Sequence, residues 1–290
     1  MKGMIMAGGT GTRLYPLTVA VNKQLLPVYD KPMVYYPLST LMLAGIREIL
    51  ILSTPSDLPR FEQLLGDGSR FGTRLEYIEQ PSPDGEVQAF LLGEGFIGDE
   101  PCALILGDNF FYGAGMQKAM KNAADKADAG RATLFCHWVK NPERFGTAEF
   151  DEDGRVTSIE EKPEHPRSNY CITGLYFYPK GVSRLARKVQ RSPRGMLELP
   201  SLNTMYMELG LIDAEVLERD ITWMDTGLVD TLADAAAFVR STQAETGRRI
   251  AAPEEIAYRK GWISKEMLLE AAEQYGKTEY GQYLKKIAEN

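Results

Sequence analysis

A glycine-rich segment near the start of the chain, residues 8–13, reads Gly-Gly-Thr-Gly-Thr-Arg and could bind phosphate groups. Glycines that follow a strand let backbone N–H groups approach phosphate oxygens, because no side chain stands in the way. The dinucleotide fingerprint GxGxxG fails at Leu14, and no GK[ST] triplet completes a P-loop. For the glycines alone, a tight strand-to-helix turn explains the segment equally well. Arg13 and Lys23 favour phosphate binding, since two cations behind a glycine loop suit a polyanion such as a triphosphate.

Two aspartates, Asp108 and Asp225, each follow a segment whose apolar residues predict a buried strand, at 102–106 and 221–224. Their carboxylates are therefore expected at the carboxyl edge of the sheet, where ligands bind in open α/β folds. Mg²⁺ takes one or two carboxylates together with substrate phosphates. A lone aspartate at a strand end more often caps a turn or a helix, and it is the pairing with a phosphate loop that favours a magnesium site.

Three further segments carry polar groups that could recognise a sugar or a base. Glu160-Glu161-Lys162-Pro163 offers carboxylates for sugar hydroxyls and an ammonium for a phosphate, although these residues alone are more typical of a charged surface loop. Gly146 would allow close backbone approach of a ligand or form an ordinary turn. Gln80 precedes a stiff turn at 81–85, and its amide could read a pyrimidine base through paired donor and acceptor groups. A structural role for Gln80 is equally consistent with the sequence.

Composition argues against several other kinds of chemistry. The 290-residue chain has 33 Lys and Arg against 40 Asp and Glu, a formal net charge of −7, which disfavours a general nucleic-acid-binding protein. With only His137 and His165, a histidine base or a multi-histidine metal site is not expected. The three cysteines are far apart and fit neither a disulfide framework nor a CxxC metal site, so we expect buried thiols.

No segment reads as a membrane span or an export signal. The apolar stretches, such as residues 49–52, have the length of strands and fall short of the ~20 residues that a spanning helix needs. The first residues lack the longer apolar region of a signal peptide. We therefore expect a cytoplasmic protein without membrane contacts.

Strand and helix patterns alternate along about the first 130 residues. The predicted strands are residues 2–7, 48–53, 75–79 and 102–106. The predicted helices are residues 33–44, 58–65, 86–96 and 116–129. Such alternation implies parallel βαβ units with right-handed crossovers.

The pattern loosens after Arg131, where strands predominate before the chain turns helical. Strands are predicted at 132–139, 147–150, 156–160 and 173–178, with Asp153-Gly154 as a hairpin turn. Helices are predicted at 182–189, 202–209, 230–240 and 253–275. We expect an α/β fold with a Rossmann-like mixed, largely parallel sheet flanked by helices. A mixed insertion would supply part of a cleft, and a small helical region would end the chain.

Several motifs resemble the signature of the sugar-1-phosphate nucleotidylyltransferases, and more narrowly that of the glucose-1-phosphate thymidylyltransferases. The glycine loop continues as Leu14-Tyr15-Pro16-Leu17-Thr18 and is followed by Lys23-Gln24-Leu25-Leu26-Pro27. The similarity extends over residues 1 to about 284. Other matching stretches are residues 29–33, 80–85, 106–109, 160–163, 173–178 and 223–227.

The resemblance implies a reaction that needs no histidine. An oxygen of the sugar 1-phosphate attacks the α-phosphorus of dTTP, and pyrophosphate leaves in line, giving a dTDP-sugar with glucose 1-phosphate as the expected sugar substrate. The protein positions the phosphates and neutralises their charge with the help of Mg²⁺.

The resemblance also implies roles for individual residues. The catalytic residues would be Arg13, Lys23, Asp108, Lys162 and Asp225, with both aspartates on Mg²⁺ and Arg13 on the departing pyrophosphate. The nucleotide would contact Gly8, Gly9, Gly11, Thr12, Arg13, Gln24, Gln80 and Gly85. Lys162 would hold the sugar phosphate, and Gly146, Glu160 and Thr173 would line the sugar pocket.

By the same resemblance, a nucleotidyltransferase core spans residues 1–229 and a helical C-terminal region spans residues 230–290. The nucleotide part of the core would be about 1–130 and the sugar-binding part about 131–229. Such proteins are typically homotetramers with a second, regulatory nucleotide site near the helical tail. Arg219, Glu255 and Arg259 match that region, although by themselves they read as surface charges.

Several positions depart from the family pattern. Glu86 stands where Leu is common and could accept a hydrogen bond from a ribose hydroxyl, which leaves UTP open beside dTTP. Met196, Pro200 and Ser201 replace residues that are usually Glu, Thr and Asp near the sugar pocket, and Leu228 replaces a usual Thr. These changes remove hydroxyl acceptors and a backbone donor, which leaves open a different sugar 1-phosphate or weaker binding of glucose 1-phosphate.

A catalytically silent regulatory subunit that binds a nucleotide sugar is the alternative from another class of protein. The retained Arg13, Lys23 and Lys162 argue against it. A protein that only binds also has little need for two metal carboxylates.

Overall fold

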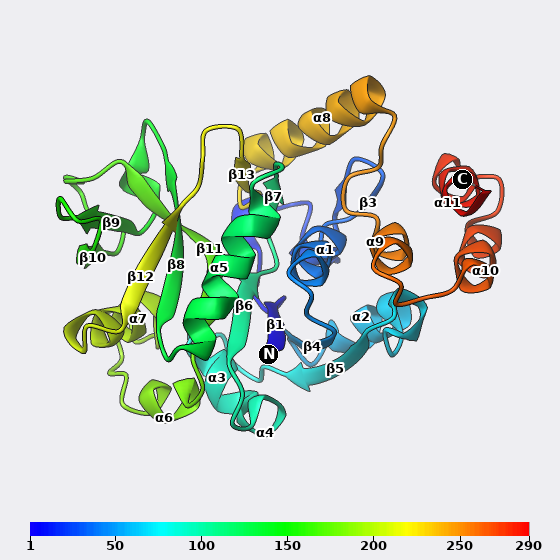
Figure 1. Cartoon of the computed structure of the whole chain (residues 1–290). Helices are drawn as coiled ribbons and strands as arrows, with labels where there is room; N and C mark the ends of the chain where they lie inside the picture. Colours follow the sequence, from blue (N-terminus) through cyan, green and yellow to red (C-terminus); the bar gives the residue numbers. More distant parts are fainter. Residues whose placement is uncertain (290) are drawn as a thin grey trace.

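The central strands of the sheet are parallel and buried on both faces. The computed structural model describes residues 1–289, and in it β5 (Arg74–Glu79), β4 (Glu48–Ser53), β1 (Lys2–Met6) and β6 (Cys102–Leu106) lie side by side in that order (Figure 1). Each neighbouring pair among them is parallel. β1 lies inside the sheet, so the glycine loop that follows it opens at the middle of the carboxyl edge.

Two groups of helices cover this sheet. The first consists of α1 (Tyr35–Leu43), α2 (Leu58–Leu65) and α5 (Met116–Asp128). The second consists of α3 (Gln88–Leu92), α4 (Glu94–Ile97), α6 (Val182–Ala186) and α7 (Leu199–Glu208). Successive residues of a strand point to opposite faces, so in β1 Ile5 packs with the first group and Met4 with the second. The apolar runs of β1, β4 and β6 are continuous because both faces of these strands are covered.

The other half of the sheet is largely antiparallel and forms the predicted insertion. β11 (Tyr170–Tyr178) runs antiparallel to β6, β8 (Ala132–Trp138) and β9 (Thr147–Phe150). β10 (Val156–Glu160) pairs with β9, and β12 (Ile212–Val216) runs parallel to β8. The result is a nine-stranded mixed sheet flanked by helices, which confirms the predicted fold class.

A small two-stranded ribbon stands beside this sheet and brings two distant segments together. β7 (Asn109–Tyr112) pairs antiparallel with β13 (Thr222–Asp225), and Asp225 lies opposite Asn109. The sequence pattern does not predict β7, because its four residues follow β6 after only two intervening positions. A second ribbon joins β2 (Pro27–Val28) to β3 (Lys31–Pro32).

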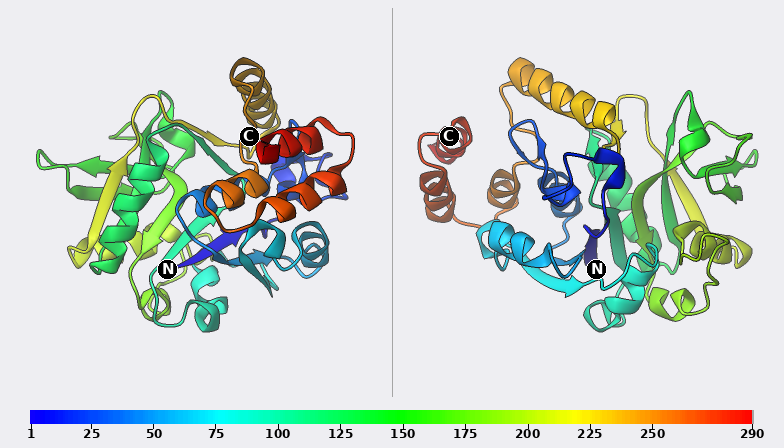
Figure 2. Two further views of the ribbon diagram at one scale, coloured as in Figure 1. Left: turned by 45° about the vertical axis from the view of Figure 1, so that its right-hand side comes forward. Right: turned by 180° about the vertical axis from the view of Figure 1, so that it is seen from behind.

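Glycines interrupt two of the predicted helices. Residues 86–96 form α3 and α4, which meet at Gly93, where an added Cβ would lie 2.8 Å from both the Ala89 carbonyl and Met4 Cε. Residues 253–275 form α9 (Pro253–Arg259) and α10 (Lys265–Tyr275), and Gly261 between them has a φ of +68°. The long α8 (Val229–Thr246) and the final α11 (Glu279–Glu289) complete the helical region, with α10 and α11 on the side of the molecule away from β9 and β10 (Figure 2).

No helix within residues 1–289 combines the length and the apolar character needed to cross a membrane. The three cysteines are free and buried, as the sequence predicts. Burial raises the pKa of the Cys102 thiol to about 12, so this thiol stays protonated near neutral pH.

A buried glutamate fastens the last helices to one another. Glu254, in α9, is fully buried and accepts hydrogen bonds from the hydroxyls of Tyr275 at 2.8 Å and Tyr280 at 2.7 Å. Tyr275 ends α10 and Tyr280 lies in the first turn of α11, so three helices meet at one side chain. α9 itself packs against α1 of the core.

Replacing this carboxylate should therefore destabilise the protein. We expect Glu254→Ala to lower the free energy of unfolding by about 2–4 kcal/mol, because two tyrosine hydroxyls lose a charged acceptor. Urea unfolding followed by circular dichroism measures this change. Glu270→Ala, at an exposed position of α10, is the matched control and should shift the free energy by less than about 0.5 kcal/mol. Equal losses in the two variants would contradict the anchoring role.

Candidate active site

Two cavities open at the carboxyl ends of the central strands. The first cavity, of about 280 Å³, lies over the ends of β1 and β6. Its lining consists of Met6, Gly8, Gly9, Thr10, Gly11, Lys23, Gln24, Gln80, Pro83, Gly85, Glu86, Leu106, Asp108 and Met196. The glycine loop, Gln80 and Gly85, which are far apart in the sequence, thus share one wall, at the edge where open α/β sheets bind ligands.

A glycine at position 8 leaves room for an ordered glutamine. A Cβ at Gly8 would overlap Oε1 of Gln80. Nε2 of Gln80 donates a hydrogen bond to Oε1 of Gln88 at 2.8 Å, and both side chains are buried. Gln88 therefore fixes the Gln80 amide in one orientation. The sequence gives no signal for Gln88, because its role depends on a side chain eight positions away.

The backbone at position 85 also leaves no room for a side chain. Its φ is +111°, and an added Cβ would overlap the carbonyl of Leu197. That carbonyl accepts a hydrogen bond from the Val87 N–H at 3.1 Å, and the Leu197 N–H donates to the Asp84 carbonyl at 2.7 Å. The turn after Gln80 and the segment before α7 are therefore joined backbone to backbone at the rim of the first cavity.

The glycine loop ends at a smaller cavity that holds both predicted metal ligands. Gly11 has a φ of +58°, and its carbonyl accepts a hydrogen bond from the Thr18 hydroxyl at 2.7 Å. The 3-10 helix η1 (Thr12–Leu14) begins there. This smaller cavity, of about 190 Å³, is lined by Gly11, Thr12, Arg13, Lys23, Asp108, Asp225 and Gly227.

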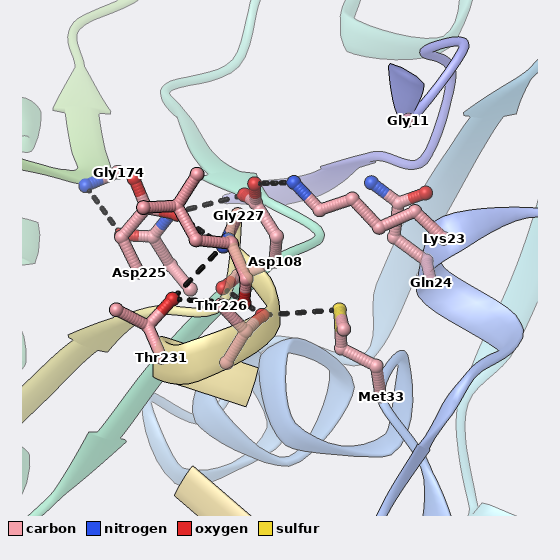
Figure 3. A network of polar contacts seen from close by, with 12 residues as sticks. Gly11, Lys23, Gln24, Met33, Asp108, Gly174, Asp225, Thr226, Gly227 and Thr231 are labelled. Atoms are coloured by element: carbon pink, nitrogen blue, oxygen red, sulfur yellow. Dashed lines mark hydrogen bonds and ion pairs between the residues drawn. The ribbon is translucent and has the colours of Figure 1, made fainter. Parts of the chain in front are cut away.

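Asp108 and Asp225 are brought together with a single lysine (Figure 3). Nζ of Lys23 donates a hydrogen bond to Oδ2 of Asp108, and the Gly227 N–H donates to Oδ1 of Asp225 at 2.8 Å. Burial opposes ionisation of Asp108, but the charge and hydrogen bond of Lys23, together with the hydrogen bonds from Asn109 and the backbone, outweigh it and lower the pKa of this carboxyl. Burial, followed by the charge of Asp108, raises the pKa of Asp225. The single positive charge of Lys23 therefore does not fully offset the negative charge of the two carboxylates.

This donor set fits Mg²⁺. A divalent cation beside both carboxylates would offset the repulsion that acts on Asp225. Mg²⁺ is commonly held by one or two carboxylates and completes its shell with phosphates and water. Within residues 1–289 there is no group of three or more His, Cys, Asp or Glu side chains that could hold a metal. A substrate phosphate is thus part of the ligand set that these residues imply.

The second cavity lies between the parallel strands and the insertion. Its volume is about 140 Å³. It adjoins the first cavity at Glu86 and Leu106 and the smaller cavity at Arg13 and Asp225, since these residues line both. The remaining lining residues include Asn109, Arg144, Gly146, Glu161, Lys162, Thr173, Tyr176, Arg194, Glu198, Leu199, Pro200, Asn203 and Trp223.

The two neighbouring glutamates of the charged loop point in different directions. Glu160, the last residue of β10, pairs with Arg167 at 2.6 Å and does not line the second cavity. Glu161 lines it and accepts a hydrogen bond from Lys162 at 2.8 Å. Because successive residues of a strand alternate between faces, a difference of one position decides which carboxylate reaches a ligand.

Lys162 is held in an uncommon backbone conformation, with a φ of +43°. Such conformations cost about 1–3 kcal/mol outside glycine and cluster at functional sites. Its N–H donates to the Phe145 carbonyl at 3.2 Å, next to Gly146, which joins the two loops at the cavity mouth.

Arg194 is a second cation of this cavity that the sequence does not single out. Its guanidinium contacts Glu161 at 3.2 Å and Glu198 at 2.7 Å. Arg194 lies in an irregular segment between α6 and α7, so no periodic pattern marks it. Together with Lys162 it gives the second cavity two cations that share one glutamate.

Asn109 links Asp108 to the second cavity. Its Nδ2 donates to Oδ1 of Asp108 at 3.1 Å, and its Oδ1 accepts from the Gly174 N–H at 2.9 Å and from Trp223 Nε1 at 2.6 Å. A Cβ at Gly174 would lie 2.5 Å from Asn109 Cγ, so a glycine is needed there. One side chain thus connects the end of β6, strand β11 and strand β13.

Three buried polar atoms of these cavities have no protein partner within residues 1–289. They are Oε1 of Gln24, Oγ1 of Thr173 and Nδ2 of Asn203. The first lies in the first cavity, and the other two lie in the second. A buried polar group without a partner is costly, so these atoms are expected to bond a polar ligand.

Only some of the residues that depart from the family pattern line a cavity of the site. Met196 lines the first cavity, and Pro200 lines the second from the first turn of α7, where a backbone N–H is not needed by the helix. Ser201 and Leu228 line neither.

A further cavity, the third cavity, is separate from the first, second and smaller cavities. Its volume is about 430 Å³, and it lies between α1, α5 and α9. Glu255 and Arg259 line it and pair at 2.7 Å, whereas Arg219 is exposed and is not part of its lining. The structure thus brings together two of the three residues expected at a regulatory site.

The sequence and the fold both have known relatives. The profile described as nucleotidyl transferase matches residues 2–242. The chain is 53% identical over 287 residues to the glucose-1-phosphate thymidylyltransferase of Neisseria meningitidis serogroup A, covering 99% of each chain. It is 48% identical over 289 residues to that of Mycobacterium tuberculosis strain H37Rv, covering 100% of this chain and 99% of the relative.

Solved structures agree with this relationship. A Bacillus anthracis structure carrying the name glucose-1-phosphate thymidylyltransferase is 34% identical, with a TM-score of 0.77 over 83% of this chain and 95% of that chain. A UDP-glucose pyrophosphorylase complexed with UDP-glucose, at 21% identity and a TM-score of 0.71, shares the fold. The chain belongs to the nucleotidyl transferase family, in the group of the glucose-1-phosphate thymidylyltransferases. Nucleotidyl transferases of this kind generally depend on a metal ion and use a nucleoside triphosphate and a sugar 1-phosphate.

Two glycines of the first cavity allow a matched test of its geometry. We expect Gly85→Ala to lower the free energy of unfolding by at least about 2 kcal/mol, because a positive φ and overlap with the Leu197 carbonyl both penalise a side chain. At Gly9 an added Cβ meets no atom within 4 Å, so Gly9→Ala should change it by less than about 0.5 kcal/mol. Thermal and urea unfolding of both variants measure the difference. Similar stabilities would mean that the turn at Gly85 is not built as described.

Proposed function

We propose that the protein joins a sugar 1-phosphate, with glucose 1-phosphate as the first candidate, to dTTP and releases pyrophosphate and a dTDP-sugar. The observation that carries this proposal is the arrangement of the cavities. A cavity with a glycine loop and ordered amides meets a cavity with Lys162 and Arg194 at two buried carboxylates. A nucleoside triphosphate and a sugar phosphate bound there would place their phosphates against each other.

The chain's own residues would position and neutralise the reacting phosphates. Lys162 and Arg194 would hold the sugar phosphate, while the glycine loop, Arg13 and Lys23 would hold the triphosphate. One phosphate oxygen forms the new bond to the α-phosphorus as the bond to the β-phosphate breaks, and pyrophosphate leaves. The attacking oxygen is already ionised near neutral pH, so no general base is required.

Asp108 and Asp225 would hold Mg²⁺, which supplies positive charge to the phosphates during transfer. Lys23 already occupies one oxygen of Asp108, and Asn109 orients the other. These contacts fix the carboxylate before substrate binds, which lowers the cost of reaching the transition state.

Specificity would be divided between the two cavities. In the first, the ordered Gln80 amide and the close-packed Gly85 would receive the pyrimidine base, and Gln24 would meet the nucleotide through its unpartnered Oε1. In the second, Gly146, Glu161, Thr173 and Asn203 would contact the sugar, with Glu161 in the place that the sequence suggests for Glu160.

We assign the nucleotide part to about residues 1–130, the sugar-binding part to about 131–229 and the helical region to 230–290. The third cavity, with Glu255 and Arg259, is our candidate for a regulatory nucleotide site, and a homotetramer is the expected assembly. Because its triphosphate substrate is made in the cytoplasm, we place the protein there.

Pyrophosphate release tests this proposal directly. The protein is mixed with Mg²⁺, dTTP or UTP, and glucose 1-phosphate or other sugar 1-phosphates, and release is expected with dTTP and glucose 1-phosphate. The absence of release with every combination would overturn the enzyme assignment in favour of a silent binding subunit.

Asp225→Asn should lower the turnover number at least ~100-fold, since it weakens charge stabilisation in the transition state. Asp234→Asn, at an exposed position of α8, is the control and should stay within about twofold of the unmodified protein. Steady-state kinetics of pyrophosphate release decides. A near-normal rate for Asp225→Asn would remove this residue from the metal site.

The adjacent glutamates offer a further matched pair. Glu161→Gln should lower kcat/KM for the sugar phosphate by about 10–100-fold, because it loses a charged acceptor and loosens Lys162 and Arg194. Glu160→Gln should change it by less than about threefold, since its partner is Arg167 outside the cavity. Kinetics at saturating triphosphate measures both variants, and a larger effect at Glu160 would reverse the assignment.

A further inference from the structure

Apart from Asp225, one carboxylate of the second cavity forms no ion pair among residues 1–289. Glu161 contacts Lys162 and Arg194, and Glu198 contacts Arg194. Glu86, which is partly buried where the first and second cavities meet, forms no ion pair within that part of the chain. The proposed reaction does not use it, so its presence at this junction needs an explanation.

The charged groups that act on Glu86 come from the second cavity. Burial, and then the charges of Glu161 and Glu198, raise the pKa of Glu86, while its own N–H and Lys162 act in the opposite direction. The charge of Glu86 in turn acts on Tyr176. Glu161, Lys162, Glu198 and Tyr176 all line the second cavity and none of them lines the first. The charged neighbours of Glu86 thus belong to the second cavity, although Glu86 lines both cavities.

Three carboxylates close to one another call for a cation. A sugar hydroxyl would satisfy hydrogen bonding at Glu86 but would leave the repulsion from Glu161 and Glu198 in place. An ammonium group satisfies both, and an amino group of ordinary basicity is protonated at neutral pH. Lys162 and Arg194 are paired with Glu161 and Glu198, and neither Arg13 nor Arg144, which also line this cavity, forms an ion pair with Glu86, so a ligand can be the source of the missing charge.

We propose that Glu86 is a specificity-determining residue that makes the second cavity prefer an amino-sugar 1-phosphate, whose ammonium group pairs with the Glu86 carboxylate. This inference rests on the proposed function and deepens it by naming the class of sugar. The phosphate end of such a ligand would meet Lys162 and Arg194. The unpartnered Nδ2 of Asn203 and Oγ1 of Thr173 would meet its hydroxyl groups.

The test compares sugars by their ratio of kcat/KM to that of glucose 1-phosphate, with dTTP as donor. The probes are the 2-, 3-, 4- and 6-amino-deoxy derivatives of glucose 1-phosphate. For at least one derivative the ratio should exceed unity in the unmodified protein and fall at least about tenfold in Glu86→Gln, which keeps size and hydrogen bonding but removes the charge. Glu86→Leu should show the same fall, and Glu79→Gln, at an exposed position of β5, should not.

Each outcome of this comparison either supports or overturns the proposed role of Glu86. A fall of less than about tenfold for all four derivatives overturns the proposal, as does a ratio below unity for each of them in the unmodified protein. A change in the preference between dTTP and UTP without a change in the sugar ratios also overturns it and assigns Glu86 to the ribose. Failure of the proposed function is distinguishable, because glucose 1-phosphate and the amino derivatives alike would then release no pyrophosphate from either triphosphate.

Discussion

Two carboxylates that repel each other have to be held in one small cavity, and the pairing of β7 with β13 achieves this. The Asp108 carbonyl accepts hydrogen bonds from the Thr226 N–H at 3.0 Å and from the Thr226 hydroxyl at 2.7 Å. Asp108 is thereby tied to the residue that follows Asp225. Asn109 ties the same point to Gly174 and Trp223. The repulsion that raises the pKa of Asp225 is thus balanced by a network that spans both halves of the sheet. Through this ribbon, Asp108 of the first cavity and Asp225 of the second cavity both reach the smaller cavity.

The cations of the site are also held in place before any ligand binds. Lys23 is bonded to Asp108, Lys162 to Glu161, and Arg194 to Glu161 and Glu198. In a chain with a net charge of −7, these pairs hold three cations at the place where phosphates are expected. Each carboxylate that orients a cation can exchange part of that contact for a substrate phosphate. Such pre-organisation lets a site without a general base stabilise charge in the transition state.

The sequence predicts what depends on local pattern and misses what depends on distant partners. The continuous apolar runs of β1, β4 and β6, and the glycine loop after β1, follow from residue types alone, as does the hairpin at Asp153-Gly154. β7 follows β6 too closely for the sequence to separate the two strands, and β12 has no continuous apolar run. The need for a glycine at position 93 depends on Met4 and Ala89, which an added Cβ would contact. Within the site, Gln88 and Arg194 escape notice because their partners lie in other elements. Whether Glu160 or Glu161 reaches the second cavity depends on which of the two residues ends β10. Residue composition does not determine that position.

The junction of the two cavities shows why a departure from the family pattern has to be read in three dimensions. In the sequence, Glu86 follows the turn that carries Gln80 and Gly85, so it is naturally assigned to the nucleoside. In the structure, Gly85 closes that turn against Leu197, and this contact carries Glu86 toward the segment that holds Glu198. Its electrostatic neighbours therefore come from residues 161–198, which are distant in the sequence. An unpaired carboxylate among paired ones favours a ligand that carries a positive charge, and the amino group of the proposed amino-sugar 1-phosphate would supply it.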